Sequence, residues 1–230
     1  RLQTPAAVRF GLNGDVVVHT PIGDNQASVV GASGLKGDAI VLNLGTGGQV
    51  SIPMAEFAIH AGLETRPMPG GGYLLVGVSL CGGEAYAHLM RFFRQVVGEF
   101  TDYSIPETAV YARMNDLAAQ AESRADGLSV DTCFAGTRLN ASARGSIRGI
   151  GLGNWTPAHL TRALIEGMVR ELAEQVPADV IDGHIDRVVA GGNAAARNPV
   201  VRQAIEAVFG RPCEIRNEPE EAALGTAMVA

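Results

Sequence analysis

Lysine, cysteine and paired histidines are scarce in this sequence, and each shortage excludes a class of protein. Lys36 is the only lysine among 230 residues, and its setting, Gly34-Leu35-Lys36-Gly37, does not fit the G-x-x-x-x-G-K-[ST] pattern. A P-loop nucleotide site is therefore excluded. Cysteine occurs only as Cys81, Cys133 and Cys213, with no C-x-x-C, which argues against a disulfide framework or a zinc site. The five histidines form no H-E-x-x-H pair.

Long apolar runs and an excess of positive charge are also missing. No apolar run approaches the about 20 residues of a membrane span, and the first residues, 1–5, do not resemble a signal peptide. The formal net charge of −6 gives no electrostatic reason to expect nucleic acid or a membrane as partner. With 47% hydrophobic and 18% charged residues, the composition is that of a globular protein. We expect a cytoplasmic location, because so few cysteines suit a reducing compartment.

Glycine, in contrast, is abundant, with 29 residues in 230. The glycines gather between segments with the patterns of strands and helices. Such loops allow a backbone to approach a ligand closely. The chain is long enough for one large domain or two small ones with a real core.

The order of patterns predicts an α/β domain with a mixed sheet and flanking helices. Asn13-Gly14 predicts a hairpin turn within residues 8–20. Thr156 predicts a helix N-cap, with Pro157 in the first turn. Strands are expected at 39–44, 49–52, within 127–137, and at 185–192 and 212–217, and helices at 82–100, 106–121, 156–176, 198–210 and 219–230.

Three glycine-rich loops could bind one ligand. Asn43 to Gly48, "NLGTGG", could form a phosphate nest, with the Thr46 hydroxyl as a further donor, or simply a hairpin turn. Gly82-Gly83 precede a helix, where an anion is favoured, or form a tight entry loop. Gly191-Gly192-Asn193 follow a strand and could support a base or ribose, or form an ordinary turn. Their spacing is not that of a dinucleotide fingerprint.

A fourth segment, "TPIGDNQASVVGAS", has a single carboxylate, Asp24. Asp24 could be a helix N-cap, since aspartate is preferred there and the next residues have helical character. It could equally be a general base at a loosened strand end, with polar neighbours that orient a substrate. The local pattern leaves both interpretations open.

The order of these four loops resembles the C-terminal domain of the FGGY carbohydrate kinases, a family with the actin-like, ribonuclease H-like ATPase fold. The G-D-x-x-A-x-x-G segment of that family is matched by Gly23, Asp24, Ala27 and Gly31. Further matches are Gly45 and Thr46 in a hairpin, Gly83 before a long helix, Gly151, Leu152, His159, Leu160, Ala163 and Glu166 in a second signature, Gly191 and Gly192 after a strand, and residues 221–227 in a closing helix. The stretches 153–164 and 196–201 are most similar to the sedoheptulokinases within that family.

The resemblance implies ATP-dependent phosphorylation of a sugar hydroxyl, with a ketose such as sedoheptulose as substrate. It implies that Asp24 is the catalytic base and binds the sugar together with Asn25. Gly45 and Thr46 would hold the β- and γ-phosphates. Mg²⁺ would bridge the phosphates, with no metal ligand assigned in this chain. A further set would line the adenosine site: Gly83, Gly191, Gly192 and Asn193.

Two features depart from the family pattern. The gap from Gly151-Leu152 to His159 is one residue shorter than usual, and no D-x-G-T phosphate hairpin occurs. We therefore expect residues 1–230 to be the C-terminal nucleotide-binding domain, inactive alone and partnered by an N-terminal sugar-binding domain. The oligomeric state, a homodimer included, stays open. The alternative is a non-catalytic actin-like domain for ATP binding or assembly, which would not need Asp24-Asn25.

Overall fold

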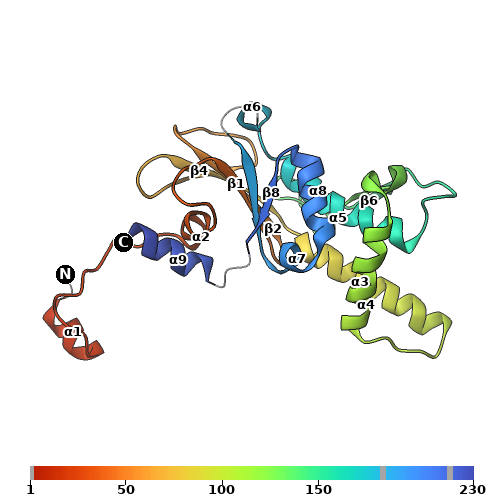
Figure 1. Ribbon diagram of the computed structural model, residues 1–230, viewed down its shortest axis with the longest axis horizontal. Coiled ribbons are helices and arrows are strands. Elements are labelled where there is room, and N and C mark those ends of the chain that lie inside the picture. The colour runs from red at the N-terminus through yellow and green to blue at the C-terminus, as the bar shows by residue number, and fades with distance from the viewer. Residues whose placement is uncertain (1–2, 182–184, 217–219) are drawn as a thin grey trace.

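A mixed sheet of six strands forms the centre of the computed structural model, which describes residues 3–181, 185–216 and 220–230 (Figure 1). The strand order is β3-β4-β2-β1-β7-β8. β1 pairs with β7 and β7 with β8 in parallel, and the other neighbours are antiparallel. The bounds are β1 (Ala39–Leu44), β2 (Gly48–Met54), β3 (Glu64–Pro67), β4 (Tyr73–Ser79), β7 (Arg187–Gly191) and β8 (Cys213–Ile215), and a separate small sheet pairs β5 (Ser129–Asp131) with β6 (Ser146–Arg148).

Helices cover both faces of this sheet, with α2 and α9 on one side and α5 and α8 on the other (Figure 1). This arrangement is the predicted α/β domain with flanking helices. The bounds are α1 (Thr4–Phe10), α2 (Asp24–Ser33), α3 (Gly82–Phe100), α4 (Glu107–Gln120), the 3₁₀ turn η1 (Ser123–Gly127), α5 (Pro157–Ala173), α6 (Ala178–Ile181), α7 (Asn193–Arg197), α8 (Pro199–Phe209) and α9 (Glu221–Val229).

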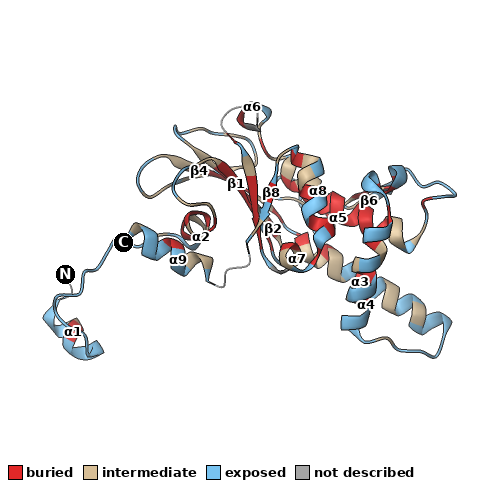
Figure 2. Cartoon of the chain, viewed as in Figure 1, coloured by how far each residue is buried: buried red, intermediate tan, exposed pale blue. Residues whose placement is uncertain are grey.

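The alternation of side chains along β1 explains why it is apolar almost throughout. Ile40, Leu42 and Leu44 belong to the main core together with α5 and α8. Ala39 and Val41 point to the opposite face and pack with α2. A strand buried on both faces needs apolar residues at successive positions rather than at alternate ones. The buried residues accordingly concentrate along the sheet and in α5 (Figure 2).

The small residues of α2 allow a very close contact with α9. A Cβ on Gly31 would lie 2.1 Å from the carbonyl oxygen of Glu221, and one on Gly225 would lie 1.8 Å from that of Ala27. No side chain larger than hydrogen fits at these two positions. The pattern Ala27-x-x-x-Gly31 therefore sets how closely α2 and α9 approach each other on one face of the sheet.

Helix α5 begins as its sequence predicts. The Thr156 side chain accepts a hydrogen bond from the backbone N–H of His159, and Pro157 stands at the first helical position. The helix is buried on most sides, including Arg162 and Glu166, whose side chains form a 2.7 Å ion pair. The bounds of α3, α4, α8 and α9 also agree with the expected helices within a few residues.

The prediction of a hairpin around Asn13-Gly14 is wrong. Residues 4–10 form helix α1, which ends at Gly11 with φ of 63°, and the chain beyond it turns at residues 14–15 without forming a strand. A type I′ turn needs positive φ at both central residues, and Gly14 is not among the glycines with positive φ. Val16, Val17 and Val18 are exposed, so no sheet covers them.

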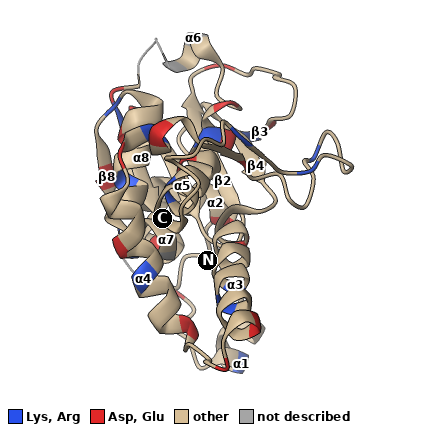
Figure 3. Ribbon diagram, turned by 90° about the vertical axis from the view of Figure 1, so that its right-hand side faces the viewer, with Lys and Arg blue, Asp and Glu red and all other residues tan. Residues whose placement is uncertain are grey.

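The hairpin of β3 and β4, which forms one edge of the sheet, is not among the strands expected from the sequence. Pro69 and three successive glycines connect these strands, and Gly70, Gly71 and Gly72 all have positive φ. Acidic and basic residues both occur along α3, α4 and α8 (Figure 3). Within the described ranges, the longest helices are too short or too polar to cross a lipid bilayer.

Candidate nucleotide and sugar site

The turn between β1 and β2 is attached directly to the start of α3. The backbone N–H of Gly83 donates to the carbonyl oxygen of Gly45 at 2.9 Å, and that of Glu84 donates to Thr46 at 3.0 Å. A Cβ on Gly83 would lie 2.5 Å from the Gly45 oxygen. Position 83 therefore requires glycine, because the backbone of α3 lies so close to the backbone of the β1–β2 turn. The helix N-terminus binds the turn rather than holding an anion at these two N–H groups.

This attachment also orients the remaining donors of the turn. In a trans peptide the N–H of the next residue points away from the carbonyl group. Because the Gly45 and Thr46 carbonyls point to α3, the N–H groups of Thr46 and Gly47 point away from it. Gly45 and Thr46 are both exposed. Together with the Thr46 hydroxyl, these groups can present several donors to one anion, as a phosphate nest requires.

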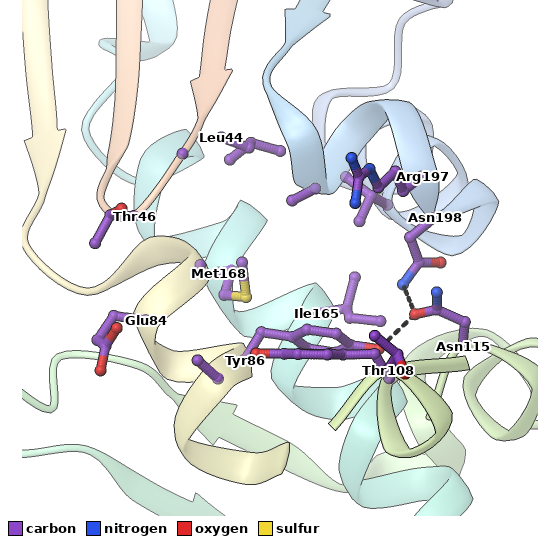
Figure 4. Close-up of a pocket in the computed structure, with 16 residues that line it drawn as sticks. Leu44, Thr46, Glu84, Tyr86, Thr108, Asn115, Ile165, Met168, Arg197 and Asn198 are labelled. Atoms are coloured by element: carbon purple, nitrogen blue, oxygen red, sulfur yellow. Dashed lines mark hydrogen bonds between the residues drawn. The ribbon is translucent and has the colours of Figure 1, made fainter. Parts of the chain in front are cut away.

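A cavity of about 550 Å³ opens beside this turn (Figure 4). Its volume is within the usual range for a small-molecule site. Gly45, Thr46 and Gly83 line it, so the structure brings together three of the predicted nucleotide residues. The remaining walls come from α3, α4, α5, α7 and α8, with Glu84, Tyr86, Thr108, Tyr111, Asn115, Ile165, Met168, Ala194, Arg197, Asn198 and Val201 among the lining residues.

One wall of the cavity is an aromatic pair supported by a hydrogen-bond chain. The rings of Tyr86 and Tyr111 stack with centroids 5.9 Å apart. The Tyr86 hydroxyl donates to Asn115 Oδ1 at 2.6 Å, and Asn198 Nδ2 donates to the same oxygen at 2.9 Å (Figure 4). Asn198 Oδ1 in turn accepts the backbone N–H of Val200. Burial raises the pKa of Tyr86, so its hydroxyl stays protonated and available as a donor.

The loop after β7 lies next to the β1 end of the same cavity. Gly192 has φ of 92°, and a Cβ on it would lie 2.6 Å from the carbonyl oxygen of Leu44, which lines the cavity. Asn193 is the first residue of α7, and Ala194 and Arg197 of that helix line the cavity. The side chain of Asn193 lies outside the described part of the structure. Gly191 packs toward α9, with its Cβ position 3.0 Å from Glu221 Oε1.

Asp24 and Asn25 lie on the side of the sheet that α2 covers, apart from this cavity. Gly23 is the N-cap of α2, and Asp24 is its first helical residue, with an exposed side chain. Asp24 Oδ1 accepts the backbone N–H of Asn25 at 2.7 Å. Gly23, and not Asp24, is therefore the N-cap residue. The Asp24 carboxylate is exposed in the first turn, where the helix dipole favours negative charge.

The Asn25 side chain turns toward the sheet rather than toward solvent. Ser51 Oγ in β2 donates to Asn25 Oδ1 at 3.3 Å. Asn25 Nδ2 is buried and has no hydrogen-bond partner. A buried donor of this kind normally finds a partner, so the amide next to Asp24 is an exception to the usual pairing of buried polar groups.

Sequence reasoning missed the cavity walls. Tyr86, Tyr111 and Asn115 lie within helices whose patterns indicate only packing, and Asn198 resembles an ordinary helix cap, which it also is. His159 and Glu166, which match the family's second signature, both lie in the packed helix α5. The described residues contain no group of three or more His, Cys, Asp or Glu placed to hold a metal ion.

Residues 41–230 match the model of the FGGY family of carbohydrate kinases, C-terminal domain. Human sedoheptulokinase is 29% identical over 220 residues, which is 92% of this chain and 45% of that protein. Mouse sedoheptulokinase is 30% identical over 216 residues, or 90% of this chain and 44% of that protein. These pairwise matches extend beyond the family model, which begins after Asp24.

The solved structure of xylulose kinase from Rhodospirillum rubrum superimposes with a TM-score of 0.84 at 26% identity, covering 100% of this chain and 45% of that one. A ligand-bound xylulose kinase from Lactobacillus acidophilus gives a TM-score of 0.77 at 22% identity. The fold is thus the actin-like ATPase fold that the sequence predicted. The chain spans less than half the length of the relatives that it matches.

Proposed function

Because the chain belongs to the FGGY family of carbohydrate kinases, we propose that it is the nucleotide-binding half of an ATP-dependent sugar kinase. In this proposal residues 1–230 form one domain and act with an N-terminal sugar-binding domain. The observation that supports it best is the exposed Gly45-Thr46 turn at the mouth of the cavity of about 550 Å³. A phosphate site beside an open, partly aromatic cavity suits a nucleotide.

ATP fits the residues present. Its β- and γ-phosphates would accept hydrogen bonds from the N–H groups of Thr46 and Gly47 and from the Thr46 hydroxyl. Adenosine would enter the cavity against Tyr86, with the Gly83 backbone in its wall and Gly192 and Asn193 in the loop beside it, whereas Gly191 packs toward α9. Mg²⁺ bound with the nucleotide would neutralise phosphate charge, and this chain supplies no ligand for it in the proposal.

Asp24 would act as the general base. Its exposed carboxylate takes the proton of the attacking sugar hydroxyl, the oxygen attacks the γ-phosphorus, and ADP leaves. Phosphoryl transfer depends mainly on positioning and charge stabilisation. Asn25 would bind the sugar beside Asp24, which requires its buried Nδ2 to become accessible when the two domains close. Asp24 and the cavity lie on different sides of the sheet, so the γ-phosphate must reach around the β1–β2 turn toward α2.

The relatives are named for sedoheptulose and xylulose, which favours a ketose such as sedoheptulose as substrate. A cytoplasmic location, where ATP and such sugars are available, belongs to the same proposal. A non-catalytic actin-like ATP-binding domain would have the cavity and the phosphate turn but would not depend on Asp24.

The test is ADP release by the two-domain protein with a panel of ketoses that includes sedoheptulose, xylulose and ribulose. Asp24→Asn should reduce turnover by about 10²- to 10⁴-fold, the usual loss for a general base, with ATP affinity nearly unchanged. Asp102→Asn in the exposed loop after α3 is the matched control and should have no effect. If Asp24→Asn retains turnover within a few-fold, Asp24 is not the base, and the non-catalytic alternative gains support.

A further inference from the structure

Ser51 is a polar residue at a position where the sheet calls for an apolar one. It lies in β2 between the buried residues Val50 and Ile52, is 2% exposed, and is paired across the sheet with Val41 and Val76. Val41 and Val76 belong to the apolar cluster under α2. A buried hydroxyl on this face is unfavourable unless it forms a hydrogen bond.

The hydroxyl of Ser51 reaches the first turn of α2. It donates to Asn25 Oδ1 at 3.3 Å, and the backbone N–H of Asn25 donates to Asp24 Oδ1 at 2.7 Å. The contact joins residues that are 26 positions apart in the sequence. Gln26 Nε2, in the same turn, donates to the Pro67 carbonyl oxygen at 3.4 Å.

The same contact orients the Asn25 amide. Because the Ser51 hydroxyl donates to Oδ1, Nδ2 lies buried without a partner. A pair selected for stability alone would satisfy both ends of the amide or replace the pair by apolar side chains. The pair is better explained by the position that it gives to the first turn of α2, where the Asp24 carboxylate is exposed.

We propose that Ser51 is a positioning residue, which holds the Asn25 amide and the first turn of α2 so that the exposed Asp24 carboxylate faces the acceptor sugar. This inference depends on the proposed function, because it assigns Ser51 a role through Asp24. Ser51 itself touches neither substrate. Positioning errors of about 1 Å can reduce rates by about 10²-fold, so a moderate loss is expected when the hydroxyl is removed.

The experiment compares Ser51→Val with Ser51→Thr in the two-domain protein. Valine and threonine have nearly the same shape, and only threonine keeps the hydroxyl. Ser51→Val should lower kcat/KM for the sugar about 10-fold, whereas Ser51→Thr should stay near wild type. The KM for ATP should change less than about twofold in both, because the cavity lies on the other side of the sheet. Ser33→Ala removes a hydroxyl that bonds to Val29 at the far end of α2 and should leave the kinetics unchanged.

A double mutant separates a positioning role from a general loss of packing. If Ser51 acts through Asp24, Ser51→Val should add little to the loss in an Asp24→Asn background, because interacting residues are not additive. Equal rates for the valine and threonine variants, or full additivity with Asp24→Asn, would overturn the inference. Retained activity in Asp24→Asn alone would instead contradict the base assignment in the proposed function, and with it the role of Ser51. Circular dichroism of each variant confirms that it is folded.

Discussion

Gly83→Ala tests whether the β1–β2 turn is the phosphate site, because it perturbs the attachment of that turn to α3. The new Cβ would stand 2.5 Å from the Gly45 carbonyl oxygen, a backbone atom that cannot move without moving the turn. The 2.9 Å hydrogen bond from the Gly83 N–H to Gly45 would be lost or stretched at the same time. The substitution should therefore displace the turn without changing the chemical nature of the Thr46 side chain.

The magnitude can be estimated from these contacts. Overpacking of this kind typically destabilises by about 1–3 kcal/mol, which corresponds to a decrease in Tm of roughly 2–12 °C for a protein of this size. If the displaced turn loses even one hydrogen bond to a charged phosphate, the free energy of ATP binding becomes less favourable by about 1.5–3 kcal/mol. The affinity for ATP should then fall about 10- to 150-fold, and that for AMP should fall much less.

Isothermal titration calorimetry with Mg-ATP and with AMP, together with thermal unfolding, provides the assay. Gly98→Ala is the matched control because it lies in the same helix with nothing within 4 Å of its Cβ position. It should stabilise the protein slightly, by about 0.5–1 kcal/mol, as is usual for glycine within a helix. A folded Gly83→Ala protein that binds ATP with wild-type affinity would refute the assignment of the turn to the phosphates.

Three further predictions concern the turn, the buried ion pair and the isolated chain. Thr46→Val should weaken ATP by about 1.5–3 kcal/mol and AMP hardly at all; equal weakening in calorimetry would place Thr46 outside the phosphate site. Glu166→Gln should lower the free energy of unfolding in urea by about 3–5 kcal/mol, because it leaves the 5% exposed Arg162 side chain without its charge partner. Glu174→Gln, where the carboxylate is 71% exposed, should change it by less than about 0.5 kcal/mol. The 230-residue chain alone should release no ADP in response to sugar, because one domain cannot hold the acceptor in line with the γ-phosphate; sugar-dependent release that Asp24→Asn abolishes would show that the site is complete in this chain.

Some of the molecule follows from local sequence because its cause is local. The cap of α5 depends on Thr156, Pro157 and His159, which are neighbours in the chain, and the C-terminal stop of α8 at Gly210 depends on one left-handed residue. The buried strands β1 and β7 are recognisable because the sheet is covered on both faces, which makes them continuously apolar. The glycines at 83 and 192 could be singled out because the close approach of another backbone segment requires a residue without a side chain.

Other features depend on which surfaces meet, and the sequence does not encode this locally. In α3, Phe92 is 52% exposed while Met90 is buried, because only one side of the helix has a partner. The β3–β4 hairpin carries a weak strand pattern, since its edge strand β3 is largely exposed and gains its order from pairing with β4.

The sequence by itself indicated the fold family, through the order of its loops and their resemblance to a known family. It also singled out the glycine-rich loops and the candidate carboxylate, because each lies in a short stretch with its own steric or chemical requirement. Only the tertiary structure decided that Tyr86, Asn115 and Asn198 form one hydrogen-bonded wall and that Ser51 holds Asn25. The two residues of each of these pairs are 26 to 83 positions apart. Their side chains meet because distant parts of the chain pack together on the two sides of the sheet, and no periodicity along the chain records which surfaces are brought together.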